Sequence, residues 1–198
     1  MRKNWLYLLL LVVLPGFNTP DNSNATWVVM PGSSLSVNGS TNINTFQCEI
    51  TNYSLPDTII CAPKAPKGQL LPMQGRLMLD ILSFDCHNKM MTNDLRKTLK
   101  YKTYPHLSIR FISINSFPDF KNPSKITGVV DISLAGVTKR FEISYLFTQD
   151  NGQMLHLKGD RVVNFSDFNL VPPSKLGGII KAKDELSVEF KLKLKPLG

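Results

Sequence analysis

The feature that most constrains the fold of this chain is an alternation of apolar and polar residues close to its C-terminal end. The segment "ELSVEFKLKLK" at 185–195 has an apolar residue at every second position, with serine, glutamate or lysine between them. Successive side chains of a β-strand point to opposite faces, so one face of this segment is apolar and the other is charged. The pattern predicts a strand whose apolar face covers a packed core, a membrane or a bound lipid.

Further segments repeat this alternation along most of the chain. They lie at 34–40, 42–50, 75–84, 106–114, 125–136, 137–147 and 154–165. Short polar or glycine-containing turns join most of them, and such turns favour hairpins between neighbouring strands. We therefore predict an all-β protein, an antiparallel up-and-down barrel or sandwich of about eight strands, because closing a sheet removes its exposed edges. An eight-stranded barrel is about wide enough to hold one small ligand.

Two regions interrupt the series of strands. The segment "NKMMTNDLRKTLK" at 88–100 places Met91, Leu95 and Leu99 four residues apart, which predicts one short helix. The stretch 51–72 is rich in proline and polar residues, and it predicts a loop or a loose hairpin.

The first residues have the layout of a secretory signal peptide. Two basic residues precede an apolar run from Trp5 to Leu14 that ends at a proline. A membrane span needs about 20 apolar residues, so this run is too short for a transmembrane anchor. We predict that residues 1–25 are a signal peptide with an approximate end, that residues 26–198 form one domain, and that the protein is periplasmic or secreted.

The chain is basic, because 23 lysines and arginines outnumber 15 aspartates and glutamates and give a formal net charge of +8. Such a charge is compatible with binding to nucleic acid. Most of the lysines, however, alternate with apolar residues along predicted strands or lie in turns, and an exported protein rarely meets nucleic acid. We therefore predict no nucleic-acid partner.

Three cysteines, Cys48, Cys61 and Cys86, occur in a chain predicted to enter an oxidising compartment, where a disulfide bond is the expected use. One of the three must be left over. The Cys86–His87 neighbours are a weak indication of zinc, but no second pair has the spacing of metal ligands. We predict no metal site and no cofactor.

Residues suited to catalysis are sparse. The histidines, His87, His106 and His156, are widely spaced, and each lies beside a different predicted strand or turn. The sequence has no GxSxG, HExxH or phosphate-binding glycine motif. An enzyme of this kind would need a nucleophile with a base or a pair of carboxylates in one pocket, so we predict a protein without enzymatic activity.

Four stretches occur in a fixed order along the chain. They are "LSVNGSTNINTF" at 35–46, "MMTNDLRKTLKYKTYPHLSIRF" at 90–111, "GVVDISLAGVTKRFEI" at 128–143 and "LKGDRVVNFSDFNLVPPSKLGGIIKAKDELSVEFKL" at 157–192. In these stretches the chain resembles the YceI-like family of bacterial polyisoprenoid-binding proteins. The resemblance implies a lipocalin-like barrel that is exported to the periplasm and holds a long-chain isoprenoid or a similar amphiphile without catalysing a reaction.

The resemblance also implies which side chains contact the ligand. The predicted cavity-lining residues are Phe46, Leu79, Ile109, Phe111, Ile132, Phe141, Phe168, Leu186, Val188, Phe190 and Leu192. The candidate contacts to a head group are Arg110, Lys139, Arg140, Lys175 and Lys181. The alternative interpretation is that the same apolar residues fill the barrel, which would then act as a cell-envelope protein-interaction or stress module without a ligand.

The stretches "FQC" and "FDCHNKM" look like a subgroup in which the two cysteines accompany each other, which implies a Cys48–Cys86 disulfide and a free Cys61. Pairing of Cys48 with Cys61 would close a shorter loop and is the alternative. A homodimer and peripheral contact with a membrane are both compatible with the resemblance. An outer-membrane barrel is disfavoured, because a helix and a double-proline loop interrupt the strands.

Overall fold

The computed structural model describes residues 24–53 and 55–197. The strands in these residues are β1 (Ala25–Thr41), β2 (Thr45–Tyr53), β3 (Thr58–Cys61), β4 (Leu71–Gln74), β5 (Arg76–Asp80), β6 (His106–Ile114), β7 (Lys125–Leu134), β8 (Val137–Gln149), β9 (Leu155–Asn164), β10 (Ser174–Lys175) and β11 (Ile180–Leu197). The helices are α1 (Lys89–Thr98) and the 3₁₀ turns η1 (Ile81–Ser83), η2 (Phe165–Phe168) and η3 (Leu176–Gly178). The predicted signal peptide, 1–25, lies outside the described residues except for its last two positions.

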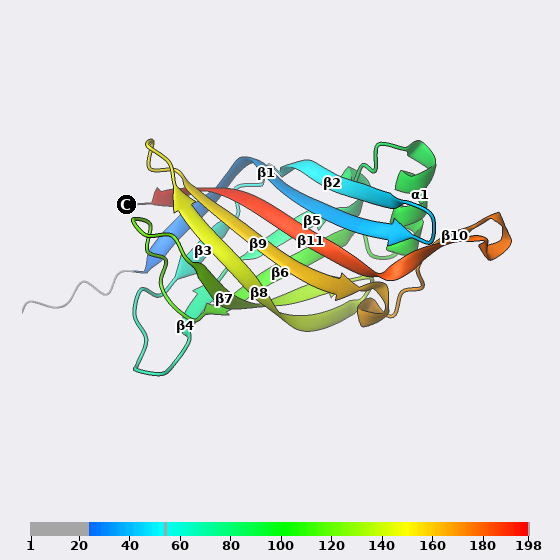
Figure 1. The fold of residues 1–198 in the computed structure, drawn as a ribbon. Coiled ribbons are helices and arrows are strands. Elements are labelled where there is room, and N and C mark those ends of the chain that lie inside the picture. The colour runs from blue at the N-terminus through cyan, green and yellow to red at the C-terminus, as the bar shows by residue number, and fades with distance from the viewer. Residues whose placement is uncertain (1–23, 54, 198) are drawn as a thin grey trace, which may run out of the picture.

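The strands form a closed antiparallel barrel in which strands adjacent in the chain are mostly adjacent in space (Figure 1). Pairing of β1 with β11 closes it. β2 and β3 follow one another along β1, and β4 and β5 follow one another along β6, so the wall contains eight strands. The barrel with one short helix that the sequence predicted is thereby confirmed, and the sandwich is excluded.

The proline-rich stretch 51–72 contributes more to the wall than the sequence predicted. β3 pairs with β1 on one side and with β4 on the other, and β4 also pairs with β6. Ile59 and Cys61 of β3 and Met73 of β4 are buried in the interior. A four-residue strand offers only two inward positions, so its alternation is hard to recognise among prolines.

Aromatic side chains fill the half of the barrel in which β1 begins. The ring centroids of Trp27 and Phe147 lie 5.6 Å apart, and those of Tyr145 and Phe190 lie 6.0 Å apart. Phe111 meets Phe190 edge-on at 6.4 Å. We call this region, defined by these five residues, the filled half.

Two wall glycines make room for these rings. A Cβ atom at Gly159 would lie 2.3 Å from the Phe190 ring, and one at Gly128 would lie 2.0 Å from the Tyr145 ring. Since real Cβ atoms do not approach other atoms so closely, any larger residue would displace the ring. The glycines therefore let each ring lie directly against the barrel wall.

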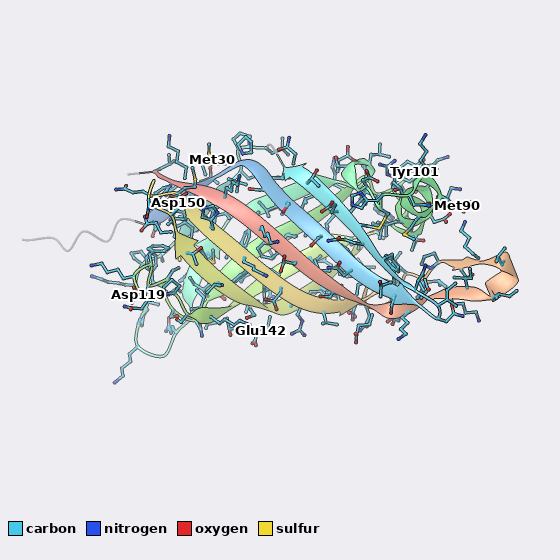
Figure 2. All side chains as sticks on the ribbon, turned by 45° about the horizontal axis from the view of Figure 1, so that its top comes forward. Met30, Met90, Tyr101, Asp119, Glu142 and Asp150 are labelled. Carbon is cyan, nitrogen blue, oxygen red and sulfur yellow. A yellow bond between two sulfur atoms is a disulfide. The ribbon has the colours of Figure 1, made fainter. Side chains whose placement is uncertain are left out.

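On the outer face, ionic side chains link neighbouring strands. Asp131 of β7 accepts hydrogen bonds from Arg140 of β8, at 2.8 Å, and from Arg110 of β6. The hydrogen bond from Arg140 is the largest influence holding the pKa of Asp131 below its ordinary value. Figure 2 shows how polar side chains such as Glu142 project from the wall. No helix in the described part of the chain is long and apolar enough to cross a membrane.

Candidate ligand-binding cavity

Three elements surround the end of the barrel opposite the N-terminal part of β1, and we call this end the mouth. They are α1, the β1–β2 turn and the β10–β11 hairpin (Figure 1). Asn42 in the β1–β2 turn bonds to the hairpin through its backbone N–H to the Lys181 carbonyl, at 3.1 Å, and through its side-chain amide to the Ile179 carbonyl, at 2.9 Å. Lys175 in the hairpin pairs with Asp94 of α1 at 2.6 Å. The three elements thus form one connected rim.

The sequence of α1 explains how it covers the mouth. The side chain of Asn88 caps its first turn by accepting from the backbone N–H groups of Met90, at 3.0 Å, and Met91, at 3.1 Å. The apolar stripe then turns Leu95 toward the barrel, where it is buried. The exposed side of α1 carries Met90, which lies at the right of Figure 2.

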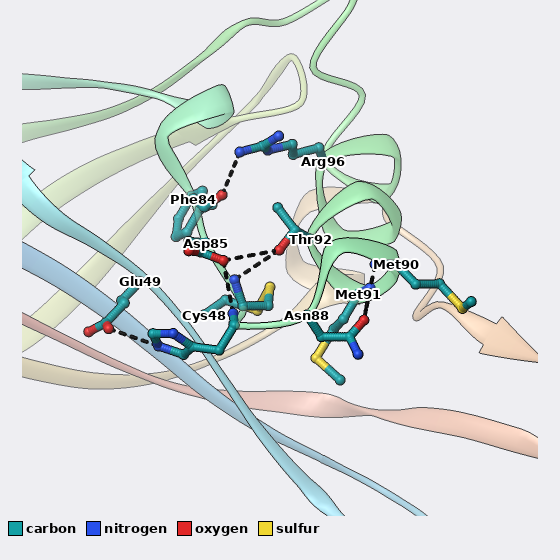
Figure 3. The surroundings of a disulfide bond; sticks show 11 residues. Cys48, Glu49, Phe84, Asp85, Asn88, Met90, Met91, Thr92 and Arg96 are labelled. Atoms are coloured by element: carbon teal, nitrogen blue, oxygen red, sulfur yellow. Dashed lines mark hydrogen bonds and ion pairs between the residues drawn. A yellow bond between two sulfur atoms is a disulfide. The ribbon is translucent and has the colours of Figure 1, made fainter.

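A disulfide holds the segment before α1 against β2. It joins Cys48 of β2 to Cys86, with Cα atoms 3.9 Å apart, and leaves Cys61 as a buried thiol (Figure 3). The backbone groups of Glu49 and Asp85 bond to each other in both directions, at 2.8 and 2.9 Å. These links add to the cap of α1, so the helix is fixed over the mouth by covalent and backbone bonds.

A second set of hydrogen bonds joins α1 to the segment that precedes it. Thr92 accepts from the Cys86 backbone N–H at 3.0 Å, and Arg96 donates to the Phe84 carbonyl at 2.8 Å (Figure 3). Thr92 is itself buried, so its hydroxyl satisfies a donor that water does not reach.

A pocket of about 250 Å³ opens between these elements, and we call it the mouth pocket. Apolar and polar side chains share its lining, because it lies at the rim. The residues around it are Thr41, Ile43, Asn44, Phe46, Cys48, Asn88, Met90, Met91, Asp94, Leu95, Phe165, Pro173, Lys175, Ile180 and Ala182.

Deeper in the barrel lies a second space of about 70 Å³, which we call the inner cavity. Its thirteen lining residues are all apolar: Leu35, Val37, Phe84, Leu95, Leu99, Leu107, Ile109, Ile132, Leu134, Val163, Phe168, Leu186 and Val188. Leu95 is the one residue that lines both spaces. Ile132 and Val188 occupy inward positions on their strands yet are only half-buried, because they face this open space. The region around the inner cavity is the hollow half of the barrel.

The aromatic rings of the filled half close the inner cavity at the end away from the mouth. Phe111 and Phe190 lie two residues further along β6 and β11 than the lining residues Ile109 and Val188, and they point to the same side. Tyr145 packs against both rings. Its hydroxyl is buried and has no hydrogen-bond partner among the described residues, and burial raises the pKa of Tyr145.

The structure divides the predicted cavity-lining residues into two groups. Phe46 lines the mouth pocket, and five others line the inner cavity, namely Ile109, Ile132, Phe168, Leu186 and Val188. The remaining five lie buried in the barrel outside both spaces; they are Leu79, Phe111, Phe141, Phe190 and Leu192. The sequence interpretation omitted the α1 residues Met91, Leu95 and Leu99, although their stripe was recognised.

The predicted head-group residues are also dispersed. Lys175 lines the mouth pocket, and Lys181 lies on the neighbouring β11. Arg110 and Arg140 lie on the outer wall, where both pair with Asp131. Lys139 pairs with Asp167, at 3.0 Å, outside both spaces.

The all-apolar lining of the inner cavity suits contact with apolar groups, whereas the mouth pocket also carries Asp94 and Lys175. The lining of the inner cavity offers no nucleophile, acid or base. His87 pairs with Glu49 at 3.0 Å and His156 with Asp150 at 3.4 Å, both on the surface. Within residues 24–53 and 55–197, no three His, Cys, Asp or Glu side chains lie together in a way that could hold a metal ion.

Comparison with known proteins identifies the class of fold. No protein-family model and no curated protein matches this sequence. Among solved structures, a polyisoprenoid-binding domain from Saccharophagus degradans, described as implicated in plant cell wall breakdown, aligns with a TM-score of 0.60 and 11% identity. That alignment covers 87% of this chain and 99% of the other.

A second solved structure, BcnA from Burkholderia cenocepacia, aligns with a TM-score of 0.53 and 16% identity over 81% of this chain and 95% of the other. At these identities the likeness establishes a shared fold. The protein is therefore an antiparallel barrel of the lipocalin-like class. More narrowly, its fold is YceI-like, as the sequence motifs predicted.

Proposed function

We propose that this protein is an exported, non-enzymatic lipid-binding protein that takes the hydrocarbon chain of a long-chain isoprenoid or similar amphiphile into the hollow half of its barrel. The observation that carries the proposal is the inner cavity, which lies inside the barrel and has thirteen apolar lining residues and no polar one. Apolar cavities of this kind stay dry and take up apolar guests. The Cys48–Cys86 disulfide supports export, since disulfides persist in oxidising compartments.

The sizes of the two spaces indicate how a chain would lie. An apolar cavity of roughly 150 Å³ holds benzene, so the 70 Å³ inner cavity has room only for the end of a chain. The mouth pocket, at 250 Å³, would hold the following part. Leu95 lines both spaces, so we expect its side chain to move aside when a chain passes from one to the other. Each methylene buried contributes about 0.8 kcal/mol before the costs of binding are subtracted.

The polar end of the ligand would remain at the rim. Lys175 and Asp94 form an ion pair there, and Asn88 and Asn44 also border the mouth pocket. We assign Lys175 as the head-group contact, since an ammonium group on a flexible stem can leave Asp94 to meet an anionic or hydroxyl head group. The solved structures that share this fold support the proposal at the level of the fold, because one of them is a polyisoprenoid-binding domain.

The test is uptake of a polyprenol, followed by native mass spectrometry of the purified protein. In Val188→Phe the new ring would occupy the inner cavity, so we expect loss of the bound mass and at least roughly tenfold weaker uptake. Val162 lies on the neighbouring strand but is exposed on the outer face, so Val162→Phe is the matched control and should bind as the wild type does. Equal uptake by wild type and Val188→Phe would refute binding in the inner cavity.

A further inference from the structure

The apolar side chains most exposed to solvent gather at the mouth. Twelve large hydrophobic residues in the described chain are exposed, and the five with the highest exposed fractions, from 65 to 83%, all lie at this end. The other seven, between 40 and 52% exposed, are scattered over the molecule. The five are Ile43, Met90, Val171, Leu176 and Ile179, and we call the surface that they define the mouth face.

The mouth face is built from connected elements rather than from a loose loop. Ile43 lies in the turn that Asn42 binds to the β10–β11 hairpin, and Met90 lies in the capped first turn of α1. At the hairpin tip Leu176 has a φ of 51°, in the left-handed region, followed by glycines that also have positive φ. The left-handed region is unfavourable for a non-glycine residue, and an exposed leucine gains nothing from burial in return. The tip thus presents Leu176 outward at a cost in the free protein.

Lysines accompany the apolar groups of the β10–β11 hairpin. From 168 to 183 the chain has three lysines, Lys175, Lys181 and Lys183, and no aspartate or glutamate. Lys181 and Lys183 are exposed, and neither forms an ion pair with any described residue. Apolar side chains set among unpaired lysines are the features by which a protein surface binds a membrane that carries anionic lipid.

We propose that the mouth face docks on an anionic bilayer, with Leu176 and Ile179 inserted at the level of the head groups and Lys181 and Lys183 against lipid phosphates. The proposal rests on the proposed function for its purpose: docking would place the mouth pocket at the membrane surface. A lipid chain would then pass between the bilayer and the barrel without exposing its methylene groups to water, which is unfavourable for each group exposed. A bilayer fits better than a second copy of the chain, because two such faces would bring the unpaired lysines of both copies together.

The experiment is flotation of the exported, purified protein with vesicles of phosphatidylcholine alone or with about 30% phosphatidylglycerol. We expect binding to the anionic vesicles, weakened by salt, and at least roughly tenfold weaker binding by the double variant Leu176→Ser/Ile179→Ser. Lys181→Gln/Lys183→Gln should lose the preference for anionic vesicles. The matched control is Leu70→Ser/Val162→Ser, which removes two exposed apolar residues elsewhere and should bind as the wild type does.

Uptake of detergent-dispersed polyprenol, measured on the same variants, separates this proposal from the proposed function. The Leu176→Ser/Ile179→Ser variant should keep uptake while losing vesicle binding, whereas Val188→Phe should do the reverse. A wild-type protein that takes up polyprenol but ignores both kinds of vesicle would overturn the docking proposal alone. So would a concentration-dependent dimer that the Leu176→Ser/Ile179→Ser change dissociates, because the mouth face would then be a contact between copies.

Discussion

The two halves of this barrel share one wall but differ in what occupies the interior. In the filled half, Phe190 and Tyr145 lie against Gly159 and Gly128, and their rings pack on each other and on Phe111. In the hollow half the inward side chains are mostly aliphatic, and α1 covers the opening with Leu95. The difference shows that an eight-stranded barrel is made solid or hollow by local choices of glycine and ring, with no change in strand number.

The largest contrast between the halves should come from truncating one inward side chain in each. Phe190→Ala would leave a new void among packed rings and should reduce the free energy of unfolding by about 3–5 kcal/mol. Val188→Ala removes groups that already face open space, so it should cost about 1–2 kcal/mol, close to the transfer term alone. Denaturant unfolding with unchanged m-values measures both. Equal losses would mean that Val188 packs as tightly as Phe190 does.

The next largest effect should come from removing the disulfide that holds the segment before α1 against β2 in the hollow half. Replacing Cys48 and Cys86 by alanine removes a link that spans 38 residues and should cost about 2–4 kcal/mol. Hydrogen exchange should accelerate at α1, while the strands of the filled half keep their protection. Cys61→Ala, which leaves the disulfide intact, serves as the control. Uniform acceleration through the whole barrel would contradict a local role for the disulfide.

Adding side-chain atoms should lower the stability of the protein in the filled half and leave it unchanged or higher in the hollow half. Gly159→Ala places a Cβ within 2.3 Å of the Phe190 ring and should destabilise by about 1–3 kcal/mol. Val188→Phe instead adds atoms to an existing space and should be neutral or stabilise by about 0.5–2 kcal/mol. Thermal melts of both variants provide the measurement. A strongly destabilised Val188→Phe would show that the inner cavity cannot accept a ring.

A smaller effect is expected from the cap of α1. Asn88→Ala removes the acceptor for two backbone N–H groups and should cost about 1 kcal/mol. Hydrogen exchange in the first turn of α1 should rise, and polyprenol uptake should become faster because the cover over the mouth opens more often. Lys97→Ala, an exposed change on the same helix, should alter neither. An unchanged first turn would show that the disulfide alone fixes the helix.

The stability that the barrel wall gives to the fold should depend on pH through the ionisation of Asp131. Its pKa is held below the ordinary value of 3.8, chiefly by Arg140, so its ionised form stabilises the fold above that pH. This stabilisation declines as pH falls below 3.8 and is lost once pH passes through the lowered pKa of the folded protein, where the carboxylate becomes protonated. Asp131→Asn should therefore melt at a lower temperature at pH 7, with the two melting curves converging in acid. A constant difference between the curves across this range would contradict the assignment.

Sequence reasoning reached the barrel because inward and outward residues alternate over strands of nine residues or more, where the pattern is unambiguous. It could not separate lining residues from packed ones. Ile109 and Phe111 share a face of β6, yet only Ile109 borders the inner cavity, because what faces each of them depends on other strands. Arg110 and Arg140 were assigned to a head group because their common partner, Asp131, lies on a third segment and is recognised only in the folded wall.

The reactivity of the buried Cys61 thiol can be used to measure local opening of the barrel wall. The thiol lies on β3, which meets β4 through only two paired residues on each strand, and burial raises the pKa of Cys61 to about 11. Because alkylating reagents attack the thiolate, the folded protein should react extremely slowly at neutral pH. Modification must therefore await separation of β3 from its neighbours. The rate at which the Cys61 sulfur is labelled therefore measures how often the barrel wall opens. Because Cys61 is a native residue, this measurement needs no engineered probe.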